Sequence, residues 1–377
     1  MRQKRWDVVD NAAKLRCRIH AMSNSQETID LTELLAPSSE GQSDVVSCDR
    51  ATAILIIDCN NLLGEGILFD DRTNTVLWTD ILSAQFHSLS LNYSEPSQCL
   101  HTVHDVPKKL GSFGLLQHHD GSSNNEGLTL PVLCAWEDGF QLYDVYQNKA
   151  LSEMSIGEDV NPCKGFTRLN DGRVDPTGRR FICGGFYGNT QGVKMKVYRV
   201  EQRKKNESEL LYHEPIVASI EVTNSICWNV DGSIMYLADS PSRQIHSYNY
   251  SIGTGELSNK QEFHSKLATE VGVPDGSCVD AEGYVWNAVW KNGVEPSCVQ
   301  RIHPTTGQVT FTVHVPDTTS QVSCCCFGGT NLDLLFITTA SESRDIEQEP
   351  YAGGLYAVRL PFRGRPESKL HFICSHT

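Results

Sequence analysis

Apolar and polar residues follow a pattern that recurs along most of the chain. Each unit begins with an aspartate-containing turn, continues into an apolar strand, and usually crosses a short polar turn into a second strand. The clearest units are FDDRTNTVLWTDILSAQFHSL from Phe69, VDPTGRRFICGGF from Val174, NVDGSIMYLADSPSRQIHSYNY from Asn229 and VDAEGYVWNAVWKNGVEPSCVQRI from Val279. Segments from Leu130 and from Leu332 fit more loosely. The pattern predicts paired β-strands and almost no helix from about residue 45 onward.

The turn aspartates give the length of the repeat. They are separated by 105, 56 and 49 residues, and they are Asp70, Asp175, Asp231 and Asp280. The first interval holds two units, because the looser segment from Leu130 falls inside it. A repeat of roughly 50 residues is the length of one four-stranded propeller blade. Because the segment 45–377 holds roughly six such units, the sequence predicts an all-β fold, a six-bladed β-propeller.

Residues 1–44 precede the repeats and are expected to form an N-terminal extension, whose role the sequence leaves open. Helix is expected only here, around Asp10 to Met22 and in a short stretch near Thr28 to Leu35. The first residues, MRQKRW, are basic but lack an apolar core behind them, so they do not resemble a secretory signal. A cytoplasmic protein is therefore expected.

Composition narrows the classes of partner. The formal net charge is −14, and Lys and Arg cluster only at Arg203–Lys205. Nucleic acid is not expected as a partner, because phosphate binding needs a basic face. The longest apolar run is Ala53–Ile57, whereas a membrane helix needs about 20 apolar residues, so no membrane association is expected.

The chain contains 14 cysteines, and three of them are adjacent at Cys324–Cys326. No Cys-x-x-Cys pair occurs, and no cysteine and histidine set has the spacing of a zinc site. The cysteines are therefore predicted to be reduced, and Cys324–Cys326 are predicted to act as small buried hydrophobic residues.

Polar residues that do not recur in every repeat lie shortly before the turn aspartates. Glu65, Asn170 and Asp275 precede the aspartate of their own repeat by five residues, and Asn224 does so by seven. Arg168 lies two residues before Asn170, so in an extended segment both side chains share a face. Equivalent positions of different blades meet at one end of a propeller, and we expect these residues to surround its central channel, on loops that lead into the innermost strands.

Carboxylate and carboxamide oxygens are hard ligands, suited to Ca²⁺, Mg²⁺ or Mn²⁺ and able to hold Zn²⁺. Each residue alone has a plainer explanation: Asn170 and Asp171 as turn formers, Asp275 in a Pro-Asp-Gly turn, Asn224 as a partner of a buried backbone group, Glu65 and Arg168 as solvated residues. The stretch TRLNDGRVDPTGRRF from Thr167 is predicted to form two successive turns, at Asp171-Gly172 and at Asp175–Gly178. The hypothesis of a site rests on the shared repeat phase.

At these residues the chain resembles the regucalcin (senescence marker protein), gluconolactonase and luciferin-regenerating-enzyme family of six-bladed propellers. The matching phrases are LGEGILFDDRTNTVLWTDI, TRLNDGRVDPTGRRFICGGF, NSICWNVDGSIMYLADS, VPDGSCVDAEGYVWNAVW and TTSQVSCCCFGG. They occur in the family's order from about Leu63 to Gly354. The resemblance implies one divalent cation bound by Glu65, Asn224 and Asp275, with Arg168 and Asn170 contacting the substrate.

The family resemblance also implies a reaction, the hydrolysis of a sugar lactone such as gluconolactone. The cation would polarise the lactone carbonyl, and Asp275 is the candidate general base for the attacking water. The chain departs from the family at GGFYGNTQGVKMK, which has no acidic residue where related animal proteins have a glutamate that contacts substrate; Tyr187 or Asn189 could replace it. Three alternatives stay open: a calcium-binding regulatory propeller without turnover, a hydrolase of another ester or phosphotriester, and a scaffold that binds proteins at its rim.

Overall fold

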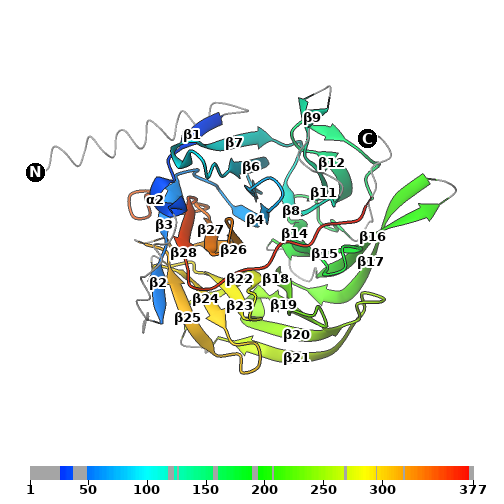
Figure 1. Ribbon diagram of the computed structural model, residues 1–377. Helices are drawn as coiled ribbons and strands as arrows, with labels where there is room; N and C mark the ends of the chain where they lie inside the picture. Colours follow the sequence, from blue (N-terminus) through cyan, green and yellow to red (C-terminus); the bar gives the residue numbers. More distant parts are fainter. Residues whose placement is uncertain are drawn as a thin grey trace, which may run out of the picture.

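The computed structural model describes residues 26–36, 49–117, 123–124, 127–155, 160–188, 194–205, 208–266, 270–293, 295–316 and 319–372. Six sheets, each with four antiparallel strands, are arranged in a ring around a common axis (Figure 1), which confirms the predicted six-bladed propeller. The helix predicted at Asp10–Met22 lies outside the described residues. Within the second predicted helical stretch, only α2 (Thr32–Leu35) is helical, and β1 (Gln26–Ile29) is a strand.

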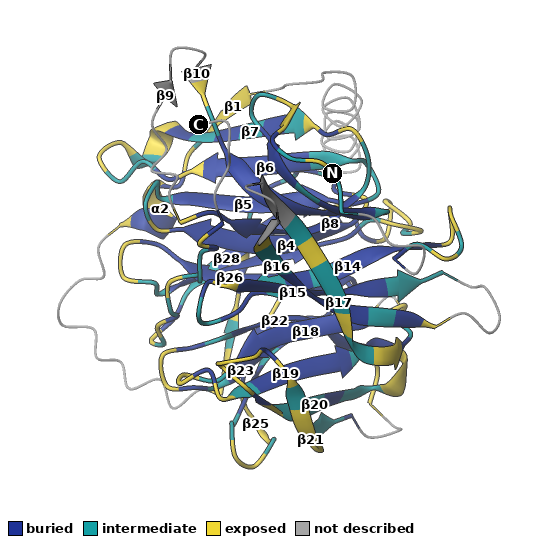
Figure 2. Cartoon of the chain, turned by 90° about the vertical axis from the view of Figure 1, so that its right-hand side faces the viewer, coloured by how far each residue is buried: buried dark blue, intermediate teal, exposed yellow. Residues whose placement is uncertain are grey.

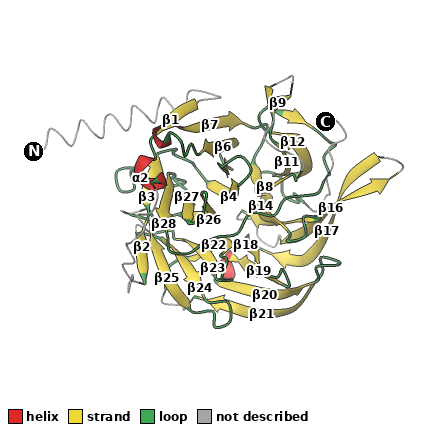
Figure 3. Cartoon of the chain, in the orientation of Figure 1, coloured by secondary structure: helices red, strands yellow, loops and turns green. Residues whose placement is uncertain are grey.

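Each blade runs from an innermost strand near the axis to an outermost strand at the rim (Figure 3). The innermost strands are β4 (Gly64–Asp70), β8 (Leu110–Leu115), β14 (Thr167–Val174), β18 (Thr223–Trp228), β22 (Val273–Val279) and β26 (Val322–Gly328). The second strands are β5 (Thr75–Asp80), β11 (Pro131–Trp136), β15 (Arg180–Tyr187), β19 (Ile234–Asp239), β23 (Val285–Trp290) and β27 (Leu334–Thr339). The third strands are β6 (Gln85–Ser90), β12 (Gly139–Asp144), β16 (Met195–Lys205), β20 (Gln244–Tyr250), β24 (Cys298–Ile302) and β28 (Leu355–Arg359).

The outermost strands are β7 (Cys99–Asp105), β13 (Lys149–Ala150), β17 (Ser208–Ile220), β21 (Leu257–Ser265), β25 (Val309–His314) and β3 (Ile54–Ile57). Short elements lie in connections between strands of one blade: β9 (Ser123–Asn124), β10 (Gly127–Leu128) and the 3-10 helices η1 (Pro96–Gln98) and η2 (Ser240–Ser242). Among the helices in the described ranges, none is long and apolar enough to span a lipid bilayer.

A strand from the beginning of the chain closes the ring. β3 pairs antiparallel with β28, so the sixth blade is completed by residues that precede the first blade, and Figure 1 shows the blue and red segments side by side at this point. Two further strands extend outer edges: β1 pairs with β7, and β2 (Arg50–Thr52) pairs parallel with β25. Closing the ring removes the free blade faces that an open array would expose.

Apolar side chains fill the space between neighbouring blades. Trp286 of the fifth blade, for example, packs edge-on against Phe327 of the sixth, with ring centroids 5.3 Å apart. Strands near the axis are buried almost throughout, whereas exposed residues gather in loops and in outer strands such as β21 (Figure 2). Cys324–Cys326 are all buried on β26, which confirms their prediction as small core residues.

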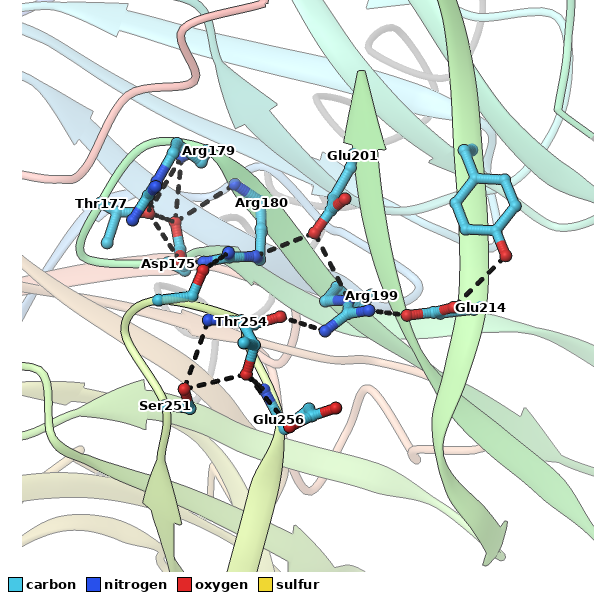
Figure 4. Close-up of polar contacts among 12 residues, drawn as sticks. Asp175, Thr177, Arg179, Arg180, Arg199, Glu201, Glu214, Ser251, Thr254 and Glu256 are labelled. Carbon is cyan, nitrogen blue, oxygen red and sulfur yellow. Dashed lines mark hydrogen bonds and ion pairs between the residues drawn. The ribbon is translucent and has the colours of Figure 1, made fainter. Parts of the chain in front are cut away.

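Turn aspartates anchor the ends of innermost strands. Asp175 accepts hydrogen bonds from the backbone N–H of Arg179 at 3.1 Å and from Thr177 Oγ1 at 2.8 Å, and it pairs with Arg180, which also reaches Glu201 (Figure 4). The predicted turn at Asp175–Gly178 is confirmed, since Gly178 N donates to Asp175 O.

The turn predicted at Asp171-Gly172 is wrong, because both residues lie inside β14, where the strand bulges instead of reversing. Asn, Asp and Gly suit a bulge for the same reason that they suit a turn: they tolerate local departures from regular strand conformation.

The C-terminal segment 363–372 crosses the end of the ring where the aspartate turns lie (Figure 1, red trace). Ala281 N donates to Arg363 O, His371 N to Gly178 O, and Leu370 N to Leu115 O. Inside this end, Glu367 forms an ion pair with Arg173 at 3.3 Å. One end of the ring is therefore covered by the chain's own C-terminal segment.

Candidate functional site

Every innermost strand carries an irregularity near its beginning. The pairing register with the second strand shifts between Glu65 and Leu68 in β4, and equivalent shifts occur in β8, β14, β18, β22 and β26. Side chains of a regular strand alternate between the two faces of the sheet, and a bulge points the side chain at the irregular position in a new direction. Six bulges at one height around the axis therefore form a ring of redirected positions, at the opposite end from the aspartate turns.

The residues predicted from repeat phase lie at or beside these bulges. Glu65 is on β4, Arg168 and Asn170 on β14, Asn224 on β18 and Asp275 on β22, and all five are buried and line one cavity. The sequence placed them on loops before the innermost strands, and this detail is wrong: they are inside the strands. The Pro-Asp-Gly segment at Asp275 is likewise part of β22 and not a separate turn.

The other two blades do not contribute a long polar side chain at the bulge. In β8 the position is Gly111, and a Cβ there would lie 2.4 Å from Leu169 O. In β26 it is Ser323, whose hydroxyl donates to Gly64 O and lies 3.1 Å from Thr338 Oγ1. The site is therefore built from four of the six blades, while the second blade allows close approach of β14 and the sixth supports the backbone next to Glu65.

A directed series of hydrogen bonds links three blades of the site. Arg168 Nη1 donates to Asn170 Oδ1, and Asn170 Nδ2 donates to Asn224 Oδ1 at 3.2 Å. Asn224 Nδ2 then donates to Ser240 Oγ at 2.9 Å, and this hydroxyl donates to Pro274 O at 2.7 Å. Because Pro274 O can only accept, the direction of each bond and the orientation of both carboxamides follow.

The pKa values of both carboxylates of the site are raised, and burial is the largest cause for each. Repulsion from Asp171 adds to the shift of both, and repulsion from Glu65 further raises the pKa of Asp275, whereas a hydrogen bond with Asp275 lowers the pKa of Glu65. Burial lowers the pKa of Arg168 to about 10, although Glu65 and Asp275 oppose this shift. Two buried carboxylates beside one guanidinium leave the site short of positive charge.

The donor set fits a hard divalent cation. Asp275 Oδ1 is buried without a hydrogen-bond partner, which is unusual for a carboxylate oxygen inside a protein. Together with Glu65 and the oriented Asn224 Oδ1, it offers only oxygen ligands, the type that Ca²⁺ and Mg²⁺ prefer. No cluster of three His, Cys, Asp or Glu with metal-site geometry occurs in the described part of the chain, so a cation here would depend on the carboxamide as well.

The cavity has a volume of about 640 Å³. Sequence reasoning missed several residues that line it, among them Phe186, Ser240, Trp290 and Glu342. Of the two residues suggested to replace a substrate-contacting acid, Asn189 lies outside the described residues, and Tyr187 packs against the apolar cluster around Ile182 instead. Ser-Pro-Ser at η2 is the kind of polar loop signal that could have directed attention to Ser240.

Comparison with known proteins places the chain in a family. Residues 63–341 match the family model described as the SMP-30/Gluconolactonase/LRE-like region, and the chain belongs to this family. It is 28% identical to regucalcin of Xenopus laevis over 302 residues, which is 78% of this chain and 90% of that protein.

Solved structures agree with this assignment. A regucalcin from Agrobacterium tumefaciens, described as a calcium-binding protein, has a TM-score of 0.69 at 26% identity and covers 86% of this chain and 98% of its own. A gluconolactonase from Xanthomonas campestris has a TM-score of 0.56 at 17% identity, covering 90% of this chain and 99% of its own. The second likeness concerns the fold alone.

Proposed function

We propose that the protein hydrolyses a lactone at a divalent cation held by Glu65, Asn224 and Asp275. The observation that carries the proposal is the convergence of two buried carboxylates, one with an unpartnered oxygen, and an oriented carboxamide on a single cavity. The family description, which includes gluconolactonase, supports a cyclic ester and a sugar lactone in particular.

A cation at these residues would polarise the lactone carbonyl and stabilise the negative charge that develops on its oxygen. Asp275 is the proposed general base, since a carboxylate has one oxygen for a ligand bond and another for a water proton. The water oxygen bonds to the carbonyl carbon, the ring C–O bond breaks, and the ring oxygen leaves as a hydroxyl after taking one proton. The products are an open-chain hydroxy carboxylate and one released proton.

Arg168 and Asn170 are proposed to orient the substrate. The Arg168 guanidinium is buried at the cavity and stacks on Phe186, 4.3 Å from the ring centroid. This stacking and the hydrogen bond to Asn170 Oδ1 hold the guanidinium in one place, where its remaining N–H groups can donate to electron-rich lactone oxygens.

A second candidate is calcium binding without turnover. It is favoured by the likeness to the calcium-binding regucalcin from Agrobacterium tumefaciens, and it would use the same residues. The two functions differ in one respect, because only the first requires lactone opening that depends on the bound cation.

The test combines calorimetry with turnover. Ca²⁺, Mg²⁺, Mn²⁺ and Zn²⁺ are titrated into the wild type, Asp275→Asn and Glu65→Gln, and gluconolactone opening is followed by proton release. We expect each variant to lose at least about 100-fold in metal affinity and to lose turnover, while Asp231→Asn, an exposed turn aspartate, retains both. Metal binding without turnover of any lactone would favour the binding protein, and unchanged affinity in Asp275→Asn would remove Asp275 from the site.

A further inference from the structure

The walls of the cavity are more apolar than a small hydroxylated substrate requires. Apolar side chains from several blades line it, among them Leu63, Leu82, Phe166, Phe186, Val273 and Trp290. All of these except Leu63 keep part of their surface exposed. We propose that the lactone accepted by this site is neutral and carries an apolar substituent, which these side chains cover while the ring ester reaches the carboxylates. This inference rests on the lactonase function proposed above.

The exposed side chain of Phe166 gives the strongest support for an apolar substituent on the substrate. Its side chain is 59% exposed, although the backbone around it is fixed: Phe166 N donates to Cys163 O, and Phe166 O accepts from Gly188 N at 2.7 Å. Thr167 Oγ1 secures the same turn by donating to Asn161 Oδ1 at 2.6 Å. A large aromatic side chain held open at a cavity by a rigid backbone is ready to cover a ligand without an ordering cost.

The part of the cavity wall that the third blade forms is aromatic, whereas a sugar substrate would need hydrogen-bond acceptors there. Phe186 pairs with Arg168 across β14 and β15 and covers one face of its guanidinium. Nη1 of the same guanidinium donates hydrogen bonds to Leu169 O and Asn170 Oδ1. The polar contacts of this wall are thus concentrated next to the carboxylates, and the wall beyond them is apolar.

Charge at the cavity argues for a neutral substrate. Glu137 and Glu342 line it in addition to Glu65 and Asp275, and Lys109 is the one added cation among the described lining residues. Glu342 is exposed, and its carboxylate acts electrostatically on Arg168. With a dication bound, the four carboxylates balance Lys109, Arg168 and the cation, so the lining offers no excess of positive charge to an anionic substrate such as a phosphorylated lactone.

The experiment compares lactones with the same ring. The full chain with its activating metal is assayed on δ-valerolactone, on a δ-lactone with a butyl substituent, and on gluconolactone. We expect the butyl lactone to exceed δ-valerolactone in kcat/KM by at least about 10-fold, the scale of several buried methylene groups. Phe166→Ala should reduce this ratio to near one, whereas Val309→Ala, an exposed apolar residue of β25 at the rim, should leave it unchanged.

A binding measurement separates failure of this inference from failure of the lactonase proposal. The butyl-substituted δ-lactam, which resists hydrolysis, is titrated by calorimetry against the wild type and Phe166→Ala, with unsubstituted δ-lactam as reference. Turnover of gluconolactone in preference to the butyl lactone would overturn the inference and keep the lactonase. If no lactone is turned over, the lactonase proposal fails; Phe166-dependent preference for the butyl lactam would then still support the apolar pocket, and equal binding of both lactams would overturn it.

Discussion

Asn170 donates a hydrogen bond from Nδ2 to Asn224 Oδ1 over 3.2 Å, across the boundary between the third and fourth blades. Two further hydrogen bonds continue the series: Asn224 Nδ2 donates to Ser240 Oγ, and Ser240 Oγ donates to the Pro274 carbonyl of the fifth blade, next to Asp275. Because each member both donates and accepts, the series fixes the carbonyl end of Asn224 in the orientation that a cation ligand needs. We infer that Ser240 contributes to the site by holding Asn224.

Ser240→Ala tests this positioning role. The substitution removes the hydroxyl that joins Asn224 Nδ2 to Pro274 O, so we expect a loss of about 1–2 kcal/mol in unfolding free energy and a 10- to 100-fold weaker metal affinity. Calorimetric metal titration and chemical denaturation measure the two effects. Ser242→Ala in the same 3-10 helix is the control, because its hydroxyl donates to Asp239 O and accepts from Gln244 N and is not part of the series. Equal metal affinity in both variants would show that the series does not position Asn224.

Arg168→Ala separates substrate binding from metal binding. A guanidinium near the cation repels it, so metal affinity should stay the same or increase, while kcat/KM for a lactone falls by about 10- to 100-fold through loss of one charge-assisted contact. Arg168→Lys should recover only part of the activity, because lysine lacks the planar fork.

Arg203→Ala is the matched control for Arg168, since Arg203 also stacks on an aromatic ring, 4.0 Å from Tyr212, but at the exposed rim. A parent-like kcat/KM in Arg168→Ala would place the guanidinium outside the substrate contacts.

The repeat made the architecture predictable from sequence, and repeat phase brought Glu65, Asn224 and Asp275 to one place. Their exact backbone setting was not predictable, because Asp171-Gly172 and Pro274–Gly276 have the composition of turns and form bulges only when a neighbouring strand pairs on both sides of them. Phe186 and Ser240 escaped notice for a different reason. Their roles depend on contacts between elements, to Arg168 and to Pro274, which no local pattern records.

The edge strand β1 contains a pH-dependent contact. Glu27 Oε1 lies 3.0 Å from His101 Nδ1 on β7, and this hydrogen bond is the main reason why the pKa of Glu27 is lowered from 4.5. A lowered folded-state pKa means that the contact stabilises the fold above pH 4.5 and is lost as the pH falls through the folded value.

Denaturation of the wild type and Glu27→Gln between pH 3 and pH 7 measures the contribution. We expect a difference of less than about 1 kcal/mol at pH 7, since Glu27 is partly exposed, and a decline of this difference below pH 4.5. A difference that grows as the pH falls would have the wrong sign for this contact.

The ion pair between Arg173 and Glu367 tests whether the C-terminal segment is part of the folded unit. The side chains are 11% and 13% exposed, and Arg173 Nη1 also donates to Ser277 O at 2.8 Å. Glu367→Gln removes the charge that balances a buried guanidinium, so unfolding free energy should fall by about 3 kcal/mol, whereas the exposed Glu347→Gln should change it by less than about 0.5 kcal/mol.

The double variant Arg173→Met with Glu367→Leu should recover most of the loss, because neither charge then remains buried. If Glu367→Gln unfolds at the same denaturant concentration as the wild type, the segment 363–372 contributes little to the stability of the ring.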